Sequence, residues 1–562
     1  MSDVRRALLW GIFSISLIML WDGWQRHRGQ PSMFDPAPAA QTAEAPASGP
    51  AGVLPTPSAA GTTAAGAPAA TPAAAPAPSQ TVTLETDVMK ATFDSRGGSL
   101  VRLELLKHRG IDADGHMTAG NLVLMDRSAQ RYYTAESGLI AANGTALPNH
   151  LTDLQVEPGE RTLAAGRDEV SLTFVSPDVN GVKLRKTYTL KRGSYVIDVE
   201  DTVANSGTAA VAPQLYLQLV RDGNVPKTST FMGPSSYTGP AVYNEAGKFH
   251  KVDFKHVEEQ AAGGKPDFEP RADNGWVAMV QHYFTSAWLV NAKQAREFYT
   301  QKTGVNQYAV GMKFPLGDVA PGASKSLKAQ LYAGPQEEKR LEALAPGFEL
   351  VKDYGFLALL AKPLFWLLDW LHSIIGNWGW AIVALVVLLK AAFFWLNASA
   401  YRSMAKMKAV NPKVQELRER LKDNPQKMQQ EMMRIYREEK VNPLGGCLPI
   451  FVQMPFFIAL YWVLLSSVEM RNAPWIGWIK DLSALDPYYI LPLVMTASTM
   501  LQTWLNPTPP DPVQARMMWI MPLVFSVMFF FFPAGLVLYW VTNNLLSIAQ
   551  QWVINRQLGI KH

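Results

Sequence analysis

Two kinds of hydrophobic pattern divide this chain. Between about Thr81 and Tyr332 apolar and polar residues alternate, for example at Val101, Leu103 and Leu105. From Trp378 onward the apolar residues form long runs separated by short polar loops. Alternation with a period of two is typical of half-buried strands, whereas a run of about 18 or more apolar residues is typical of a transmembrane helix. The pattern predicts a multidomain protein: a large all-β sandwich at 81–335, then an α-helical polytopic membrane domain.

The residues before the sandwich predict a membrane anchor and a tether. Arg5 and Arg6 precede the apolar stretch Ala7–Trp21, and no small-x-small cleavage site follows it. Residues 1–24 are therefore expected to form an N-terminal transmembrane signal anchor that stays attached, with later cleavage in the alanine-rich stretch as the alternative. Residues 25–80 are rich in Ala and Pro and nearly lack large side chains, which predicts a disordered linker.

The apolar runs after the sandwich predict one helix on the membrane surface and five spans. Phe356–Ile375 is apolar, but Lys362, Asp369, His372 and Ser373 share one helical face. We therefore assign 336–376 to a helical connector and an amphipathic interface helix. Transmembrane helices are predicted at 377–397, 444–468, 488–505, 517–532 and 535–555, which with the anchor makes six.

The polar loop after the first of these five spans sets the orientation. Arg402–Lys440 holds eleven Lys and Arg against six Asp and Glu, a net charge of +5. By the positive-inside rule this loop is cytoplasmic. Threading the remaining spans from that point places both termini in the cytoplasm and the sandwich on the other side of the membrane.

The same loop, at 398–443, is predicted to form a cytoplasmic helical hairpin. Apolar residues recur at intervals of three and four on both sides of an Asp423-Asn424-Pro425 turn. Most charges of the hairpin are expected to be solvated. Methionine side chains adapt to varied partners, so the apolar stripe is a candidate contact surface that includes Leu417, Leu421, Met428 and Met432.

One basic residue stands out within the spans. Lys390 is the sole ionisable side chain between Trp378 and Leu396. A charge at membrane depth costs a few kcal/mol, and such residues usually face protein or a water-filled cavity and mark a functional site. The alternative is that the Lys390 amine snorkels to the nearby cytoplasmic interface and does nothing else.

Several functional classes are disfavoured by what the sequence holds. The single cysteine, Cys447, excludes an internal disulfide. The net charge of +5 is small and no nucleic-acid motif accompanies it, so no nucleic-acid recognition is expected. No phosphate-binding Gly-x-x-x-x-Gly-Lys motif occurs. We expect no enzyme, no catalytic residue, no cofactor and no metal site.

A secondary transporter with a mid-membrane cationic site remains an alternative, as does a tethered sugar-acting enzyme, which would need a carboxylate or His constellation in the sandwich.

Four motifs carry a family resemblance. They are Asn442-Pro443-Leu444-Gly445-Gly446-Cys447-Leu448-Pro449, Gln453-Met454-Pro455, Asp486-Pro487-Tyr488-Tyr489-Ile490-Leu491-Pro492 and Phe532-Pro533-Ala534-Gly535-Leu536-Val537-Leu538-Tyr539-Trp540. Over about Asp353 to Gln557 the chain resembles the YidC membrane protein insertases, bacterial relatives of the mitochondrial oxidase-assembly and thylakoid insertases. The anchor, linker and sandwich are similar to the Gram-negative form of that family, which has a large periplasmic domain.

The resemblance implies a function and a place in the cell. It implies an insertase and chaperone of the bacterial inner membrane, with five spans that enclose a hydrophilic groove open to cytoplasm and lipid. Implied partners are nascent inner-membrane proteins, the Sec translocon, the lipid bilayer, and the ribosome or signal-recognition machinery.

The resemblance also assigns roles to residues. It makes Lys390 the groove charge, where the family usually has arginine, and Val386 stands where relatives often carry a hydroxyl. Candidates for client contact are Met454, Phe457, Tyr539 and Trp540, the last in place of the second of two paired tyrosines. Each of these four is as readily a core residue.

Overall fold

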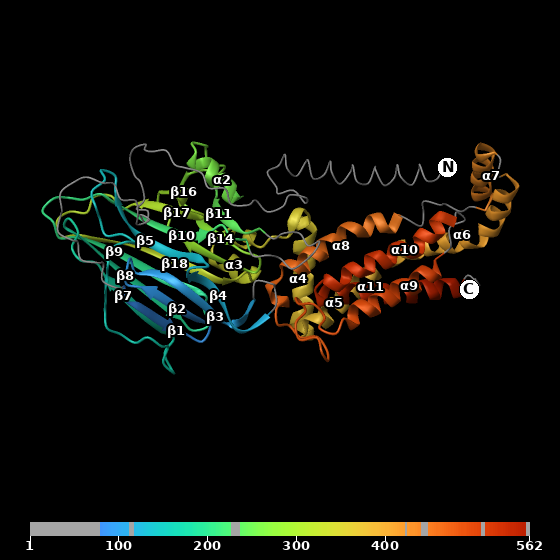
Figure 1. Cartoon of the computed structure of the whole chain (residues 1–562), viewed down its shortest axis with the longest axis horizontal. Helices are drawn as coiled ribbons and strands as arrows, with labels where there is room; N and C mark the ends of the chain where they lie inside the picture. The colour runs from blue at the N-terminus through green and yellow to red at the C-terminus, as the bar shows by residue number, and fades with distance from the viewer. Residues whose placement is uncertain are drawn as a thin grey trace, which may run out of the picture. The chain divides into compact units, whose positions relative to one another are not determined.

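The computed structural model describes residues 79–111, 117–225, 237–421, 424–439, 448–506 and 512–557. The predicted anchor, nearly all of the linker, Asp423 of the hairpin turn and the 442–447 motif lie outside the described residues. The described residues form a β-sheet region followed by a helical region (Figure 1). The predicted fold class is confirmed at that level, whereas the count of six spans stays a prediction.

The strands form two nine-stranded sheets with antiparallel pairing between neighbours. The first sheet runs in the order β1 (Thr81–Glu85), β2 (Met89–Asp94), β3 (Ser99–Ile111), β4 (Met117–Arg127), β5 (Tyr132–Ala141), β10 (Pro213–Asp222), β17 (Gln307–Pro315), β16 (Arg296–Gly304), β13 (Arg271–Ala272). The second runs β12 (Lys248–Lys251), β11 (Gly239–Asn244), β14 (Trp276–Val280), β15 (Phe284–Leu289), β18 (Ser324–Pro335), β9 (Val196–Asn205), β8 (Val182–Lys191), β7 (Glu169–Val175), β6 (Gln155–Val156). A short helix, α2 (Phe254–Ala261), follows β12.

The alternating residues of the sequence build the core between these sheets. Leu103 and Leu105 of β3, Leu217 of β10 and Leu184 of β8 are all completely buried and belong to one apolar cluster. Because successive side chains of a strand point to opposite faces, one face of each sheet is apolar and packs on the other sheet. The predicted strands therefore fold as a sandwich.

The helical region begins at the end of β18. Its elements are α3 (Glu338–Leu344), η1 (Phe348–Val351), η2 (Gly355–Leu357), α4 (Ala358–Ile375), α5 (Trp378–Ala392), α6 (Phe394–Arg420), α7 (Pro425–Glu438), α8 (Leu448–Ser466), η3 (Val468–Met470), α9 (Ile490–Leu505), α10 (Pro512–Met528), η4 (Phe529–Phe531) and α11 (Ala534–Gln557). A second apolar core joins α4, α5, α8, α9 and α11.

The helix predicted at 377–397 is shorter in the structure. α5 ends at Ala392, and the chain bends by 66° at Phe393 before α6 starts. Phe394 to Leu396 therefore belong to the first helix of the hairpin, which is 27 residues long. An apolar run by itself gives no signal of such a bend, because all of its residues favour burial on either side of the break.

Length and composition alone single out few candidate spans. Among the described helices, α4 is the one long and apolar enough to cross a membrane, and the bent pair Trp378–Ala392 and Phe394–Ser403 also qualifies if it counts as one span. Shorter apolar helical segments lie at Val452–Ser466, Ile490–Leu505 and Ala515–Phe531.

Candidate functional site

Lys390 lies near the end of α5 and contacts α11. Asn377 caps the start of α5, since its side chain accepts a hydrogen bond from the Trp380 amide, and this fixes where the helix begins. The Nζ of Lys390 donates to the Oγ of Ser547 over 2.7 Å. Within the described residues no carboxylate pairs with the Lys390 ammonium. The predicted groove charge is thus partly buried and bound to a neutral partner.

A polar stripe on α11 surrounds this contact. Its residues recur at intervals of three and four, and all are at most 5% exposed: Asn544, Ser547, Gln551 and Asn555. Residues at this spacing lie on one helical face. The stripe was not predicted from the sequence, although the spacing of its residues is visible there, because neutral polar residues in an apolar run are a weaker signal than a charge.

Hydrogen bonds join the stripe and its neighbours to other helices. The Asn544 side chain donates to the hydroxyls of Ser498 (3.1 Å) and Thr499 (2.9 Å) in α9. Gln551 donates to Oδ1 of Asn506 over 3.1 Å. Between α8 and α6, Gln453 donates to Asn397 over 2.8 Å. We call the stripe together with Lys390, Asn397, Gln453, Ser498 and Thr499 the interhelical polar cluster.

The four client-contact candidates lie on α8 and α11. The ring of Phe457 lies 4.2 Å from that of Trp540 and 5.7 Å from that of Tyr539. Tyr539 is 8% exposed, whereas Met454 is 50% exposed. The structure therefore brings three of the candidates together and leaves Met454 apart on the surface of α8.

The hairpin helices pack through one short apolar contact. Val410 and Val414 of α6 are buried against Met432, Ile435 and Tyr436. Asn424 caps α7 by accepting a hydrogen bond from the Lys427 amide. Leu417 is 3% exposed, whereas Leu421 and Met428 are half-buried and are not members of that cluster.

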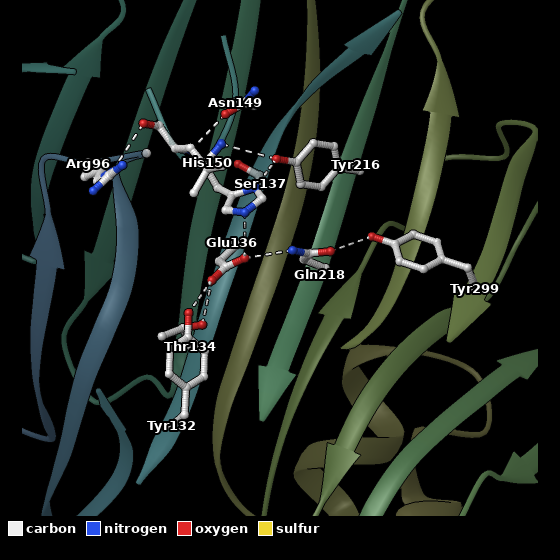
Figure 2. Close-up of polar contacts among 12 residues, drawn as sticks. Arg96, Tyr132, Thr134, Glu136, Ser137, Asn149, His150, Tyr216, Gln218 and Tyr299 are labelled. Carbon is white, nitrogen blue, oxygen red and sulfur yellow. Dashed lines mark hydrogen bonds and ion pairs between the residues drawn. The ribbon is translucent and has the colours of Figure 1, made fainter. Parts of the chain in front are cut away.

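The sandwich holds a carboxylate–histidine pair that the sequence did not reveal. Figure 2 shows Glu136 of β5 among side chains from β5, β10 and β16, with His150 from the β5–β6 loop above it. Nε2 of His150 lies 3.7 Å from a Glu136 oxygen, and Nδ1 contacts the Tyr216 hydroxyl. The two residues are brought together by sheet pairing, so no spacing in the sequence announces them.

Both carboxylate oxygens of Glu136 already accept a hydrogen bond. Thr134 donates to Oε1 over 2.8 Å, and Gln218 donates to Oε2 over 2.7 Å. Glu136 and His150 are 5% and 7% exposed, and burial lowers the pKa of His150 although Glu136 opposes this. A general acid or base must reach its substrate. The network is therefore suited to hold strands together and poorly suited to catalysis.

Metal binding finds no support in the described ranges. No group of three or more His, Cys, Asp or Glu side chains there is arranged to hold an ion.

Comparison with known proteins decides the family. Residues 81–367 match the family model of the YidC periplasmic domain, and residues 370–561 match that of the 60Kd inner membrane protein. A protein of Cupriavidus necator named membrane protein insertase YidC is 56% identical over 99% of this chain and 98% of its own length. The chain belongs to the YidC insertase family.

Other relatives agree with this YidC assignment. The Ralstonia nicotianae protein of the same name is 55% identical over 99% of this chain and 98% of its own. A crystal structure of an active YidC insertase, with its first transmembrane domain resolved, is 20% identical, covers 84% of this chain and 91% of its own, and has a TM-score of 0.38. At that TM-score the structural likeness adds nothing to the assignment. Members of the YidC family are insertases, not enzymes.

Proposed function

We propose that this chain inserts client segments into the bacterial inner membrane and assists their folding, with the interhelical polar cluster as the client-facing site. One observation carries the proposal: the Lys390 ammonium, among apolar helices, bonds to a hydroxyl, and no carboxylate of the described ranges pairs with it. Leaving a charge without a counter-ion at membrane depth costs a few kcal/mol. Such a cation is useful where an acidic or polar client segment supplies the missing partner during passage.

The client's route runs from the cytoplasm past Lys390 and into lipid. A groove between the helices opens toward cytoplasm and lipid and is closed outside. The client's apolar segment leaves between α8 and α11, where Phe457, Tyr539 and Trp540 form an aromatic cluster and Met454 is exposed. Transfer of the apolar segment to lipid drives the step, and an acidic tail that moves outward gains about 2.3 kcal/mol per charge per 100 mV.

The membrane topology of the proposal has six spans, with both termini in the cytoplasm and the sandwich in the periplasm. The basic hairpin supports this orientation. Lipid contact is supported by large apolar side chains that are exposed on α9 and α10: Leu493, Leu501, Trp504, Trp519, Ile520, Leu523, Val524, Phe525 and Val527. α10 has 17 residues, about 26 Å at 1.5 Å per residue, which is short of the ~30 Å hydrocarbon core, and a short span thins the bilayer around it.

We place α4 on the membrane surface, although its length would allow it to cross. Its polar residues are held by the connector, since Asp369 pairs with Lys339 and Lys362 lies 3.9 Å from Glu349. A separate stripe of α4 is apolar and exposed: Leu359, Trp366, Trp370 and Ile374. A helix with one anchored face and one exposed apolar face, rich in Trp, suits the interface.

The hairpin is proposed to meet the partners on the cytoplasmic side. Its basic excess favours anionic surfaces, which fits a translating ribosome or the signal-recognition machinery. Cooperation with the Sec translocon is proposed from the family resemblance.

Reconstitution of the purified full-length protein tests the function. Liposomes that carry the protein and a membrane potential should integrate a single-span client with an acidic outside tail, as read by protease protection, while empty liposomes should not. Integration no better than in empty liposomes would refute the proposal. If the same vesicles instead took up small solutes, the secondary-transporter alternative would replace it.

A further inference from the structure

The Lys390 ammonium is held in place by a hydroxyl from a distant part of the chain. Ser547, which accepts its hydrogen bond over 2.7 Å, lies 157 residues later on α11 and is 2% exposed. One turn before Lys390 on its own helix stands Val386, which is apolar and 1% exposed. α5 therefore supplies no hydroxyl of its own at that turn, and α11 does.

The Ser547 hydroxyl can donate one hydrogen bond and still accept another from Lys390. Its hydroxyl donates to the carbonyl oxygen of Asn543 over 2.8 Å. A serine hydroxyl has one hydrogen and two lone pairs, so both lone pairs remain for other groups. Lys390 uses one of them. Ser547 thus joins α5 and α11 at the single charge of the polar cluster.

A lysine at this place needs such a restraint. Lys390 is two residues from the end of α5 at Ala392, and its long flexible side chain lets the amine move toward the water interface. Arginine could make two parallel hydrogen bonds to a carboxylate, whereas lysine acts as a point charge whose effect depends on where it sits. The location of the ammonium is therefore set by its hydroxyl partner.

We infer that Ser547 is a positioning residue, which holds the Lys390 ammonium inside the interhelical polar cluster and so determines how strongly the protein favours clients with acidic tails. This rests on the proposed function of Lys390. Loss of the hydroxyl would leave the charge in the protein but move it toward the cytoplasmic interface, where an acidic tail is already solvated and gains less from meeting it.

The test compares two variants of nearly equal shape, Ser547→Thr and Ser547→Val, in proteoliposomes with full-length protein. The readout is the ratio of insertion of an acidic-tail client to that of the same client with a neutral tail. Ser547→Thr should keep the wild-type ratio, and Ser547→Val should lower it about fivefold, the effect of one lost hydrogen bond of about 1 kcal/mol. Thr542→Val removes a hydroxyl of the same helix that bonds to its own backbone, to Leu538, and should leave the ratio unchanged.

The same pair of variants is then made in a Lys390→Ala background. There Ser547→Val should have no further effect on the ratio, because no ammonium remains to be placed. An equal fall for both clients, or an undiminished effect in the Lys390→Ala background, would overturn the positioning role. If Lys390→Ala lowers the ratio and Ser547→Val does not, this inference alone fails. If Lys390→Ala itself leaves the ratio unchanged, the proposed role of Lys390 fails first. Detergent melting curves confirm that each variant is folded.

Discussion

Lys352 and Glu469 form a buried ion pair, with the ammonium 3.2 Å from a carboxylate oxygen and the Lys352 side chain fully buried. The same ammonium lies 3.7 Å from the centre of the Phe365 ring in α4. The Lys352 ammonium therefore contacts both α4 and the segment after α8, and it holds α4 against that segment.

Breaking this pair should be costly. Glu469→Gln leaves a buried ammonium without its counter-charge, which typically costs about 3–5 kcal/mol. We expect a clear fall in the detergent melting temperature of Glu469→Gln. The matched control is Glu200→Gln, which removes an exposed pair with Lys328 at 4.0 Å and should cost less than about 1 kcal/mol. Equal melting temperatures for the two variants would contradict the assignment.

The charge at Lys390 should matter for some clients more than others. Lys390→Arg keeps the charge and should preserve insertion. Lys390→Ala should lower insertion of acidic-tail clients about tenfold, the equivalent of one charge-assisted contact of about 1.4 kcal/mol, and should affect neutral-tail clients less. Insertion yields in proteoliposomes measure this. Equal yields of the alanine variant for both kinds of client would show that Lys390 merely snorkels.

Sequence patterns revealed the parts of this protein whose structure is set by local periodicity. The alternation at Leu215, Leu217 and Leu219 predicted a strand, and these residues are completely buried in β10. Local periodicity determines which face of an element is buried, so the sandwich could be predicted without knowing how its strands pair.

Contacts between distant segments could not be predicted in this way. Nothing near Lys390 in the sequence points to Ser547, and nothing near Glu136 points to His150, because each pair is made by packing of separate elements. The bend at Phe393 was likewise hidden within a uniformly apolar run. The sequence identified the charge of the site, and the structure identified its partner.

The hairpin packing offers a further test. Val414 is 1% exposed and packs with Val410 against α7, so Val414→Asp places a charge in the contact and should separate the two helices. Crosslinking from the hairpin to a stalled nascent chain should fall while the melting curve of the remaining helices is kept. Glu416→Gln, on the exposed side of α6, is the control. Unchanged crosslinking would make the hairpin a passive loop.

The stability of the protein should depend on pH through His108. This β3 residue contacts the rings of Tyr195 and Phe284. Burial, with smaller contributions from Arg471 and Arg340, lowers its pKa from 6.5 to about 4. Between pH 6.5 and about 4, His108 is protonated in the unfolded chain but stays neutral in the folded protein. Stability therefore falls as the pH drops through this range and levels off below it. Above pH 6.5 His108 is neutral in both states, so it does not make the stability depend on pH.

Substitution separates this residue from the other titrating groups. His108→Gln removes the titration, so its melting temperature should fall less between pH 6.5 and 4 than that of the wild type. The two proteins should differ by no more than about 3 kcal/mol in how far their free energy of unfolding changes over this pH range, which is the free energy equivalent of the whole pKa shift. A His108→Gln slope equal to wild type would exclude His108 as the source.

The last prediction concerns the sandwich, whose loss should spare insertion but weaken the protein. All residues of the interhelical polar cluster lie on or next to α5–α11, so removal of 81–335 leaves the cluster complete. Several contacts would be lost. Among them, His282 Nε2 lies 2.9 Å from the Leu465 carbonyl oxygen, Arg471 lies over the rings of Tyr283 and Phe284, and Lys251 pairs with Asp353. The whole of 81–335 is deleted because a deletion that spared β18 would remove β9 and β15, its two hydrogen-bonded neighbours, and leave both edges of the strand unpaired. The deletion protein should melt at a lower temperature yet insert a small acidic-tail client at close to the wild-type yield. Complete loss of insertion in a folded, correctly oriented deletion protein would show that the sandwich takes part in insertion itself.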